Sequence, residues 1–395
     1  MQEFDAVVVG GGPAGATAAH DLACAGRSVL LLDRAGRIKP CGGAVPPQLL
    51  ADFAVPESLL VNKVDAARIV APSARVADMP VTGGYVGMVD RDVFDEWLRQ
   101  RAAAAGATRR TGLFTTLERD AQGRAILRYR EGGSRSGETR AVRARMVIGA
   151  DGALSQVARQ AVPQAAEARH VFAYHEVIES PRTEGDGFGA SRCDVYYQGA
   201  LSPDFYAWVF PHGPTTSVGT GTFQKGFSLR DAVARLRRDT GLDRMATIRE
   251  EGAPIPLRPL SRWDNGTDVV LAGDAAGVVA PASGEGIFYA MTGGRLAAQA
   301  VDAALAQRDP RLLRQARARF MKAHGQVFQV LEIMQRFWYS TDNRRERFVS
   351  ICRDPDVQAL TWQGYMYKKL VRARPMAHLR IFVKNIAHLT GLAAA

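Results

Sequence analysis

Three glycines near the start of the chain have the spacing of a turn that binds a dinucleotide. Gly10, Gly12 and Gly15 form the pattern G-x-G-x-x-G directly after the apolar segment 4–9. The first glycine permits a tight turn, the second lets the backbone approach a pyrophosphate, and the third lets a helix pack closely on a strand. Free N–H groups at the start of the following helix, predicted over about residues 14–25, would then bind the phosphates. The residues expected at the phosphates are Gly10, Gly12, Pro13, Ala14 and Gly15.

An acidic residue follows at the spacing expected for recognition of a ribose. Asp33 ends the next apolar segment, residues 28–33, and comes 18 residues after Gly15. A carboxylate at the end of this second strand can accept hydrogen bonds from the ribose hydroxyls. We therefore expect Asp33, with the adjacent Arg34, at the cofactor.

Two later turns each place an aspartate after an apolar segment. "GADG", residues 149–152, contains Asp151, and "GDAAG", residues 273–277, contains Asp274. Each follows a run of Val, Ile or Leu and precedes a helical pattern, which predicts strand–turn–helix units. Because the sequence contains only one G-x-G-x-x-G, we expect no second Rossmann unit dedicated to NAD(P)H.

The three motifs together resemble the FAD-binding domain of the p-hydroxybenzoate-hydroxylase-like flavoproteins. The resemblance implies that FAD is the dinucleotide, that Asp151 lies near its phosphates and that Asp274 binds its ribityl chain. It also implies that Arg91, in "MVDRDVFDEWL", lies beside the FAD. The segment "SGEGIF", residues 283–288, would begin a helix whose N-terminus faces the flavin ring. Further cofactor residues implied in these segments are Gly273, Gly284, Gly286 and Ile287.

Two other stretches bear on what the flavin acts on. "PCGGAVPP" spans residues 40–47, and "FYAWVFPHG" spans residues 205–213. Together they resemble the geranylgeranyl reductase family, whose members saturate isolated prenyl double bonds with reduced FAD. The resemblance runs nearly end to end and is closest to the branch that makes phytyl chains in bacteriochlorophyll or chlorophyll synthesis. It implies that Cys41, Gly42 and Gly43 lie beside the flavin.

The aromatic stretch could form an apolar wall. Tyr206, Trp208 and Phe210 alternate by two and therefore share one face if the segment is a strand. A C20 chain offers only apolar surface and alkene π-faces, so its tunnel should be aromatic and aliphatic. The alternative is that this face packs as ordinary core. The candidate substrate contacts are Tyr206, Trp208, Phe210 and Pro281.

Saturating an isolated alkene requires a proton as well as a hydride. Cys41, next to two glycines, is the first candidate for the proton donor, and its alternative is a small buried hydrophobe. Tyr206 and His212 are the other catalytic candidates. His212 departs from the family pattern, because many members have a lysine after Phe-Pro, and the role of that lysine is not carried over. The resemblance implies NADPH as a transient electron donor, with ferredoxin as the alternative.

The pattern of elements predicts an α/β protein. We expect a discontinuous Rossmann-like FAD-binding domain, an inserted β-rich substrate domain and a basic helical C-terminal region. The ranges are 1–65 with 85–165 and 262–307 for the first, 66–84 with 166–261 for the second, and 308–395 for the third.

The charge of the chain is unevenly distributed. The net charge is +11, and residues 308–384 carry 17 Lys and Arg against 6 Asp and Glu, whereas the remainder is balanced. Such basic, aromatic helical segments suit the surface of an anionic membrane, and a solvated basic face is the alternative. Nucleic acid is disfavoured because no binding motif accompanies the charge. Four scattered cysteines and the spacing of the histidines predict no metal site.

The expected location and substrates follow from these features. No stretch reaches the roughly 18 uninterrupted apolar residues of a spanning helix, and no secretory signal is evident. We expect a cytoplasmic protein held peripherally on the photosynthetic (intracytoplasmic) membrane. The resemblance implies geranylgeranyl diphosphate or geranylgeranylated bacteriochlorophyll as substrate. Rival interpretations are a flavin monooxygenase or halogenase on the same fold, a reductase of archaeal-type isoprenoid lipids, and a non-enzymatic prenyl-binding protein.

Overall fold

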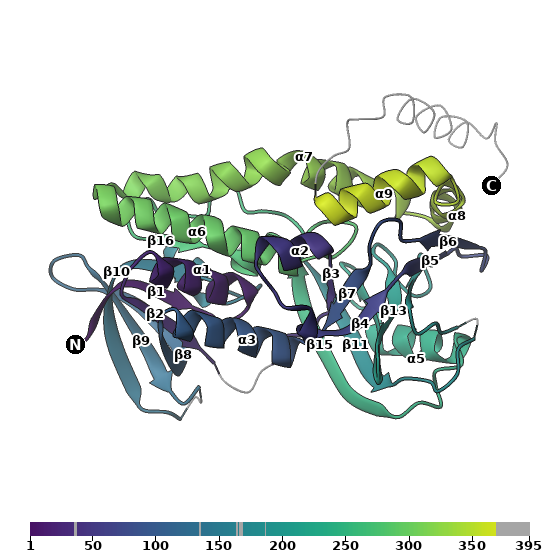
Figure 1. Cartoon of the computed structure of the whole chain (residues 1–395), viewed down its shortest axis with the longest axis horizontal. Coiled ribbons are helices and arrows are strands. Elements are labelled where there is room, and N and C mark those ends of the chain that lie inside the picture. Colours follow the sequence, from purple (N-terminus) through teal and green to yellow (C-terminus); the bar gives the residue numbers. More distant parts are fainter. Residues whose placement is uncertain (35–37, 134–135, 163–164, 166–168, 186, 369–395) are drawn as a thin grey trace. The chain divides into compact units, whose positions relative to one another are not determined.

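The computed structural model describes residues 1–34, 38–133, 136–162, 165, 169–185 and 187–368. The chain forms two compact units, each assembled from three separate segments (Figure 1). The first unit comprises Met1–Lys39, Arg91–His170 and Pro254–Gly325. The second comprises Pro40–Asp90, Val171–Ala253 and, within the described residues, 326–368.

The first unit is built on a six-stranded sheet. Four neighbouring pairs are parallel and give the order β8–β2–β1–β10–β16, while β9 pairs antiparallel with the extensions of β8 and β10. The strands are β1 (Glu3–Val9), β2 (Val29–Asp33), β8 (Thr108–Arg119), β9 (Ala125–Glu131), β10 (Thr139–Gly149) and β16 (Val269–Leu271). Val7, Leu31 and Val270 at the centre of this sheet are completely buried. Continuous apolar runs of this kind are what a parallel sheet covered on both faces requires.

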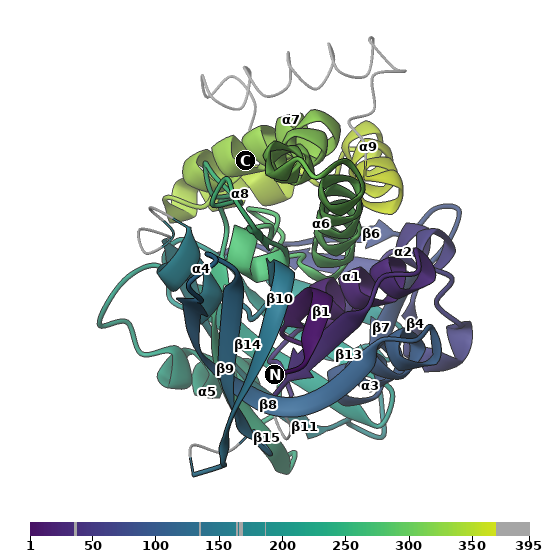
Figure 2. The same ribbon diagram turned by 90° about the vertical axis from the view of Figure 1, so that its left-hand side faces the viewer.

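Two helices of the first unit pack against each other next to the glycine turn. Helix α1 (Pro13–Cys24) follows the turn and packs against α6 (Ile287–Gln307), as Figures 1 and 2 show. A Cβ at Gly294 of α6 would lie 2.9 Å from the carbonyl carbon of Ala14, so this close packing requires glycine. The other elements of this unit are α3 (Arg91–Ala104), α4 (Gln156–Ala161), η3 (Gly273–Ala276) and η4 (Pro310–Arg314).

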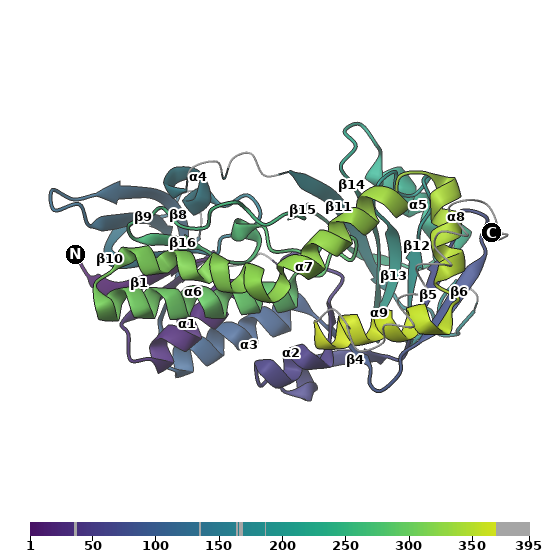
Figure 3. The ribbon, with the colours of Figure 1, turned by 90° about the horizontal axis from the view of Figure 1, so that it is seen from above.

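The second unit contains a seven-stranded sheet in the order β15–β11–β14–β13–β12–β5–β6 (Figure 3). Helix α5 (Leu229–Asp239) packs on β14, and its buried Val233 and Leu236 join the apolar cluster on that face. The strands are β5 (Ala66–Val70), β6 (Val76–Pro80), β11 (His170–Glu179), β12 (Arg192–Tyr196), β13 (Ala207–His212), β14 (Thr215–Thr222) and β15 (Thr247–Pro256).

A small sheet completes the second unit and changes the domain ranges expected from the sequence. Strands β3 (Ala44–Val45) and β4 (Leu60–Val64) both pair with β7 (Val86–Val89). These hydrogen bonds place residues 40–65 and 85–90 in the second unit, whereas the sequence analysis assigned them to the FAD-binding domain. The remaining elements of this unit are α2 (Pro47–Asp52), η1 (Glu57–Leu59), α8 (Asp342–Ile351) and α9 (Pro355–Tyr367).

The expected C-terminal region, 308–395, is not one separate body over its described part. Helix α7 (Gln315–Trp338) begins in the first unit and ends in the second. Residues 369–395, which carry part of the basic excess, lie outside the described residues. None of the helices within the described ranges combines the length and apolar composition needed to span a bilayer.

Candidate functional site

The glycine turn between β1 and α1 has the geometry that its sequence pattern predicts. Gly10 has φ +104°, and a Cβ there would lie 2.6 Å from the carbonyl carbon of Ala150. A Cβ at Gly15 would overlap the backbone of Gly10. Gly12, by contrast, is the N-cap of α1 and has open space beside it. No side chain caps α1 and its first turn holds no acid, so its N–H groups face a cradle suited to an anion.

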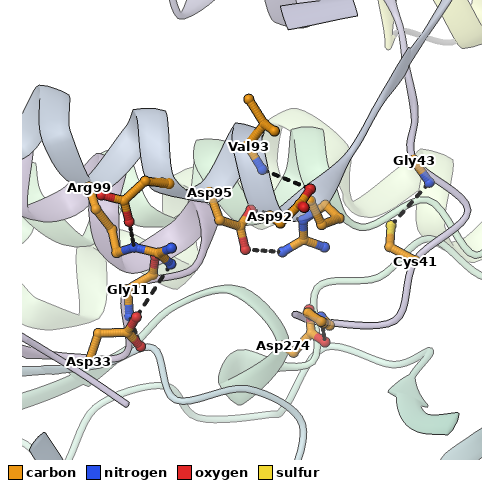
Figure 4. Close-up of polar contacts among 12 residues, drawn as sticks. Gly11, Asp33, Cys41, Gly43, Asp92, Val93, Asp95, Arg99 and Asp274 are labelled. Atoms are coloured by element: carbon orange, nitrogen blue, oxygen red, sulfur yellow. Dashed lines mark hydrogen bonds and ion pairs between the residues drawn. The ribbon is translucent and has the colours of Figure 1, made fainter. Parts of the chain in front are cut away.

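Asp33 lies beside this turn and is held by an arginine that the sequence analysis did not identify. The Asp33 carboxylate accepts a hydrogen bond of 3.0 Å from the Gly11 N–H. Arg99, from α3, lies 3.3 Å from the same carboxylate and donates a bond of 3.3 Å to the Gly11 carbonyl (Figure 4). The guanidinium group therefore fixes both the acid and the turn. Arg34, the neighbour that we expected at the cofactor, is exposed.

Asp151 uses both carboxylate oxygens within its own turn. It accepts hydrogen bonds from the Ser155 hydroxyl and from the backbone N–H groups of Gln156 and Val157, the latter two at 2.6 and 3.2 Å. Burial raises the pKa of the Asp151 carboxyl group above its ordinary value. The side chain thus orders the start of α4, while the backbone around Asp151 lies against Gly10.

Asp274 lies in η3 and its side chain is only 6% exposed. One of its oxygens forms an ion pair with Lys39, a residue that the sequence analysis did not single out. Its other oxygen faces Gly286, at 4.0 Å from the position of a Cβ there. Gly286 is the N-cap of α6, which has no side-chain cap, so the helix that we expected near residues 283–288 begins at Ile287. Asp274 therefore lies next to the N-terminus of α6.

The turn before α6 contains the other residues expected in this part of the site. Ala280 donates its N–H to the Glu285 carbonyl, and Gly284 donates its own to the Ala280 carbonyl. Pro281 lies inside this tight turn, and Gly284 has φ +66°. Gly273, at the start of η3, also has positive φ, and a Cβ there would lie 2.7 Å from the Ala14 Cβ. The first unit thus brings the glycine turn and the Asp274 turn together.

Arg91, at the start of α3, is buried. Two of its N–H groups donate to the two oxygens of Asp95, at 2.8 and 2.7 Å (Figure 4). The pair lies within one helix at the i,i+4 spacing, which neutralises both charges locally.

The loop that contains Cys41 lies in the second unit. The Cys41 thiol, half-buried, accepts a bond of 3.4 Å from the Gly43 N–H (Figure 4). Gly42 lies against the ring of Phe210, 3.0 Å from its Cδ2 when a Cβ is built. Gly43 has φ +71° and lies against His212. The two glycines thus let the loop approach the side chains of β13.

His212 joins that loop to β7. Its Nδ1 lies 3.1 Å from a carboxylate oxygen of Asp90, and its Nε2 lies 3.1 Å from the carbonyl oxygen of Gly42. Both neighbours are acceptors, and a neutral imidazole has only one N–H. The ring thus lies between two acceptors, one on the Cys41 loop and one directly after β7.

The three aromatic residues of the second motif form a continuous row. The ring centroids of Tyr206 and Trp208 are 5.9 Å apart, and those of Trp208 and Phe210 are 6.2 Å apart. Trp208 and Phe210 lie in β13 and Tyr206 directly precedes it, so the row extends one residue beyond the strand that we expected to hold all three. Tyr206 and Trp208 are buried, and Tyr206 also contacts Tyr197 at 6.0 Å between ring centroids. These contacts make the row part of a larger aromatic cluster in the second unit.

The histidines and acids of the described ranges do not gather into any group of three or more that could hold a metal ion. His175 is buried and hydrogen-bonded to Ser217 and Glu251. The residues next to His175 in the sequence do not predict these hydrogen bonds, because both partners are more than 40 residues away along the chain.

The chain matches known families over most of its length. Residues 58–329 match a family described as FAD binding domain, and residues 8–47 match one described as NAD(P)-binding Rossmann-like domain. A structure from Thermoplasma acidophilum, described as geranylgeranyl bacteriochlorophyll reductase-like, superposes with a TM-score of 0.81 at 24% identity. That match covers 95% of this chain and all of the other, which establishes the shared fold.

Comparison with curated relatives identifies the family to which the chain belongs. The geranylgeranyl diphosphate reductase of Rhodobacter capsulatus is 56% identical over 390 residues, covering 99% of this chain and 98% of the relative. The digeranylgeranylglycerophospholipid reductase of Methanoculleus marisnigri is 33% identical and covers 78% of each chain. Identity and coverage both favour the first over the archaeal lipid enzyme. The chain belongs to the geranylgeranyl diphosphate reductase family.

Proposed function

We propose that this protein reduces isolated double bonds of a geranylgeranyl chain with bound FAD. The substrate is geranylgeranyl diphosphate or geranylgeranylated bacteriochlorophyll, and the product is the phytyl form. The near-complete match to the Rhodobacter relative supports this proposal. The structural observation that carries it is the row of Tyr206, Trp208 and Phe210 beside the Cys41 loop. Such a wall offers apolar area and π-faces, the two features that a polyprenyl chain can recognise.

The first unit fits FAD. The open cradle at Gly12 and the uncapped start of α1 suit the pyrophosphate, and Asp33, held by Arg99, suits a ribose. The Asp274 carboxylate can accept hydrogen bonds from the ribityl hydroxyls, because both of its oxygens are acceptors. When bound, FAD supplies the hydride that the alkene receives. The remaining residues assigned to this site are Pro13, Ala14, Arg91, Asp151, Gly284, Gly286 and Ile287.

The proton comes from the protein. Adding a hydride to one alkene carbon and a proton to the other converts C=C into two saturated centres. Cys41 is the donor that we assign, because its thiol is half-buried in a glycine loop that lies against the aromatic row. After the transfer its thiolate takes a proton from water. His212 holds the loop through the Gly42 carbonyl, and Tyr206 is the alternative donor on the row itself.

The electrons come from NADPH, which docks transiently after each turnover. The match of residues 8–47 to an NAD(P)-binding Rossmann-like family is compatible with nicotinamide chemistry, but the same glycine turn serves FAD in this proposal. Reducing purified protein anaerobically with NADPH, and separately with reduced ferredoxin, identifies the donor by the rate at which the flavin absorbance is lost.

The membrane contact is part of the same proposal, because the substrates are amphiphiles. The second half of α7 exposes Val330 and Ile333, 41% and 67% accessible, and the basic Arg336, which is exposed and pairs with Glu332. Apolar and basic side chains on one helix suit the surface of an anionic membrane such as the photosynthetic membrane. Binding to anionic vesicles at low salt and release by high salt would support this peripheral contact, whereas retention in high salt would contradict a contact driven by charge.

Mass spectrometry of the product tests the reaction. Purified protein is incubated with NADPH and geranylgeranylated bacteriochlorophyll, or with geranylgeranyl diphosphate, with and without air. A stepwise gain of hydrogen pairs in the absence of oxygen is expected. A gain of oxygen that requires air would identify a monooxygenase instead, and a protein that binds no FAD and changes neither substrate would favour a prenyl-binding protein.

A further inference from the structure

A chain of hydrogen bonds crosses four adjacent strands of the seven-stranded sheet. The indole N–H of Trp208 donates to the hydroxyl oxygen of Ser217 at 3.0 Å, and that oxygen lies 2.8 Å from Nδ1 of His175. Nε2 of His175 lies 3.0 Å from a carboxylate oxygen of Glu251. These residues come from β13, β14, β11 and β15, which are consecutive neighbours in the sheet. The aromatic row is thus connected to a charged group on the sheet's last strand.

The chain is buried at the end that meets the row. Trp208, Ser217 and His175 are 6%, 3% and 4% exposed, and the Glu251 side chain is 13% exposed. A buried donor that loses its partner is not compensated by water. The Ser217 hydroxyl is the acceptor that satisfies the indole N–H of Trp208 in its present orientation.

The donors and acceptors fit together in one direction. An indole nitrogen only donates, so Ser217 accepts from Trp208. A carboxylate only accepts, so His175 donates the hydrogen on Nε2 to Glu251. With the hydrogen of the neutral ring on Nε2, Nδ1 accepts the hydrogen of the Ser217 hydroxyl. The guanidinium of Arg249, 2.9 Å from Glu251, anchors this carboxylate. Each member is thus held by the next, and the tautomer of His175 is fixed by both neighbours.

The indole ring of Trp208 also packs directly against a glycine, Gly219. A Cβ at Gly219 would lie 2.6 Å from Cε2 of Trp208 and 2.6 Å from Cβ of His175. Gly219 pairs with Trp208 across β13 and β14 and with His175 across β14 and β11. The missing side chain makes room for the ring, and the Ser217 hydroxyl sets the rotation of the ring within that room.

We propose that Ser217 and His175 are positioning residues that fix the rotation of the Trp208 indole and thereby decide which double bonds of the prenyl chain are reduced. The proposal rests on the proposed function, because it assigns Trp208 to the wall along which the chain lies. A C20 chain must shift along that wall by one isoprene unit between successive reductions. An indole ring of fixed orientation holds each isoprene unit of the chain in the same position along the wall. If the ring rotates, the chain is held less well, and it dissociates before all target double bonds are saturated.

The first test observes the hydrogen bond between Trp208 and Ser217 directly and does not depend on enzymatic turnover. In protein labelled with ¹⁵N-tryptophan, the Trp208 indole resonance is assigned by its absence from Trp208→Phe. In Ser217→Ala this resonance should move upfield and exchange its proton faster than in the wild type, and Ser217→Thr, which retains a hydroxyl, should restore it. The matched control is Thr216→Val, which removes the adjacent buried hydroxyl, bonded to Ser180. An indole resonance unchanged in Ser217→Ala would overturn the proposal.

The second test measures products. Ser217→Ala should raise the ratio of partly to fully reduced chains by about three- to tenfold, the effect expected from one lost hydrogen bond, while FAD content stays that of the wild type. His175→Phe should change the ratio in the same direction, and His175→Gln, which can still bond Ser217, should change it less. An equal shift in Thr216→Val, or an unchanged ratio despite a moved indole resonance, would overturn the proposal. A wild type that reduces no prenyl chain would overturn the proposed function, whereas the indole resonance still tests the hydrogen bond.

Discussion

Gly43 leaves no room for a side chain between its backbone and the imidazole ring of His212. A Cβ at this position would overlap the ring and lie 2.5 Å from the carbonyl oxygen of Val89. The backbone of Gly43 also has φ +71°, which disfavours any residue with a side chain. Two independent constraints therefore require glycine where the Cys41 loop meets β13 and β7.

The first prediction concerns this contact. Gly43→Ala should lower the free energy of unfolding by about 1–2 kcal/mol from the left-handed backbone alone, and further because the added methyl displaces His212. Gly26→Ala is the matched control, because Gly26 has φ +77° and open space around it. Urea unfolding of both variants isolates the effect of the clash. Equal losses in the two variants would mean that the loop moves away from His212 without cost.

The second prediction concerns the proton donor. Cys41→Ala should lower turnover by about a hundredfold or more, the scale of general acid catalysis, while leaving FAD content unchanged. Cys24→Ala, which removes an exposed cysteine from α1, should keep full turnover. Product formation and flavin absorbance of the purified variants measure the two effects separately. Full activity of Cys41→Ala would eliminate Cys41 as the donor and leave Tyr206.

The third prediction concerns Lys39. Its ammonium group pairs with the buried Asp274 carboxylate, which our proposal places at the ribityl chain of FAD. Lys39→Met should weaken FAD binding by about tenfold or more, because the buried Asp274 carboxylate loses the cation that pairs with it and holds it in place. Lys39→Arg should retain most of the affinity. Titration of apoprotein by flavin fluorescence quenching measures the dissociation constant.

Lys63→Met is the control for this prediction, since Lys63 forms an exposed pair with Glu57 in the second unit. It should bind FAD as the wild type does. The same dissociation constant in Lys39→Met and wild type would show that Asp274 does not need its cation when the cofactor binds.

The fourth prediction concerns pH. Hydrogen bonds from Arg109, and then Arg99, lower the pKa of Glu96 from 4.5 to about 2. Since the folded pKa lies below the unfolded one, the stabilisation is complete above pH 4.5 and is lost as the pH falls towards 2. Glu96→Gln should therefore be less stable than wild type at neutral pH, and the difference should shrink as the pH falls below 4.5. Urea unfolding at several pH values measures this difference, and one that stays constant would contradict the assignment.

The sequence alone determined the parts of the molecule whose cause is local. The G-x-G-x-x-G turn, the strand before it and the helix after it follow from glycines and apolar residues within about 30 positions. The alternation of Tyr206, Trp208 and Phe210 predicted their common face for the same reason, because a strand has a side-chain period of two. The family resemblance then supplied the cofactor and the reaction that these local patterns could not specify.

Only the tertiary structure decided which distant side chains meet. Lys39 and Asp274 are 235 residues apart, and His212 and Gly42 are 170 residues apart. No periodicity encodes such contacts, because they depend on the order and register of the strands. Strand order also moved residues 40–65 to the second unit, since β3 and β4 pair with β7. It likewise aligned Trp208, Ser217, His175 and Glu251 on four neighbouring strands, where their hydrogen bonds form one chain.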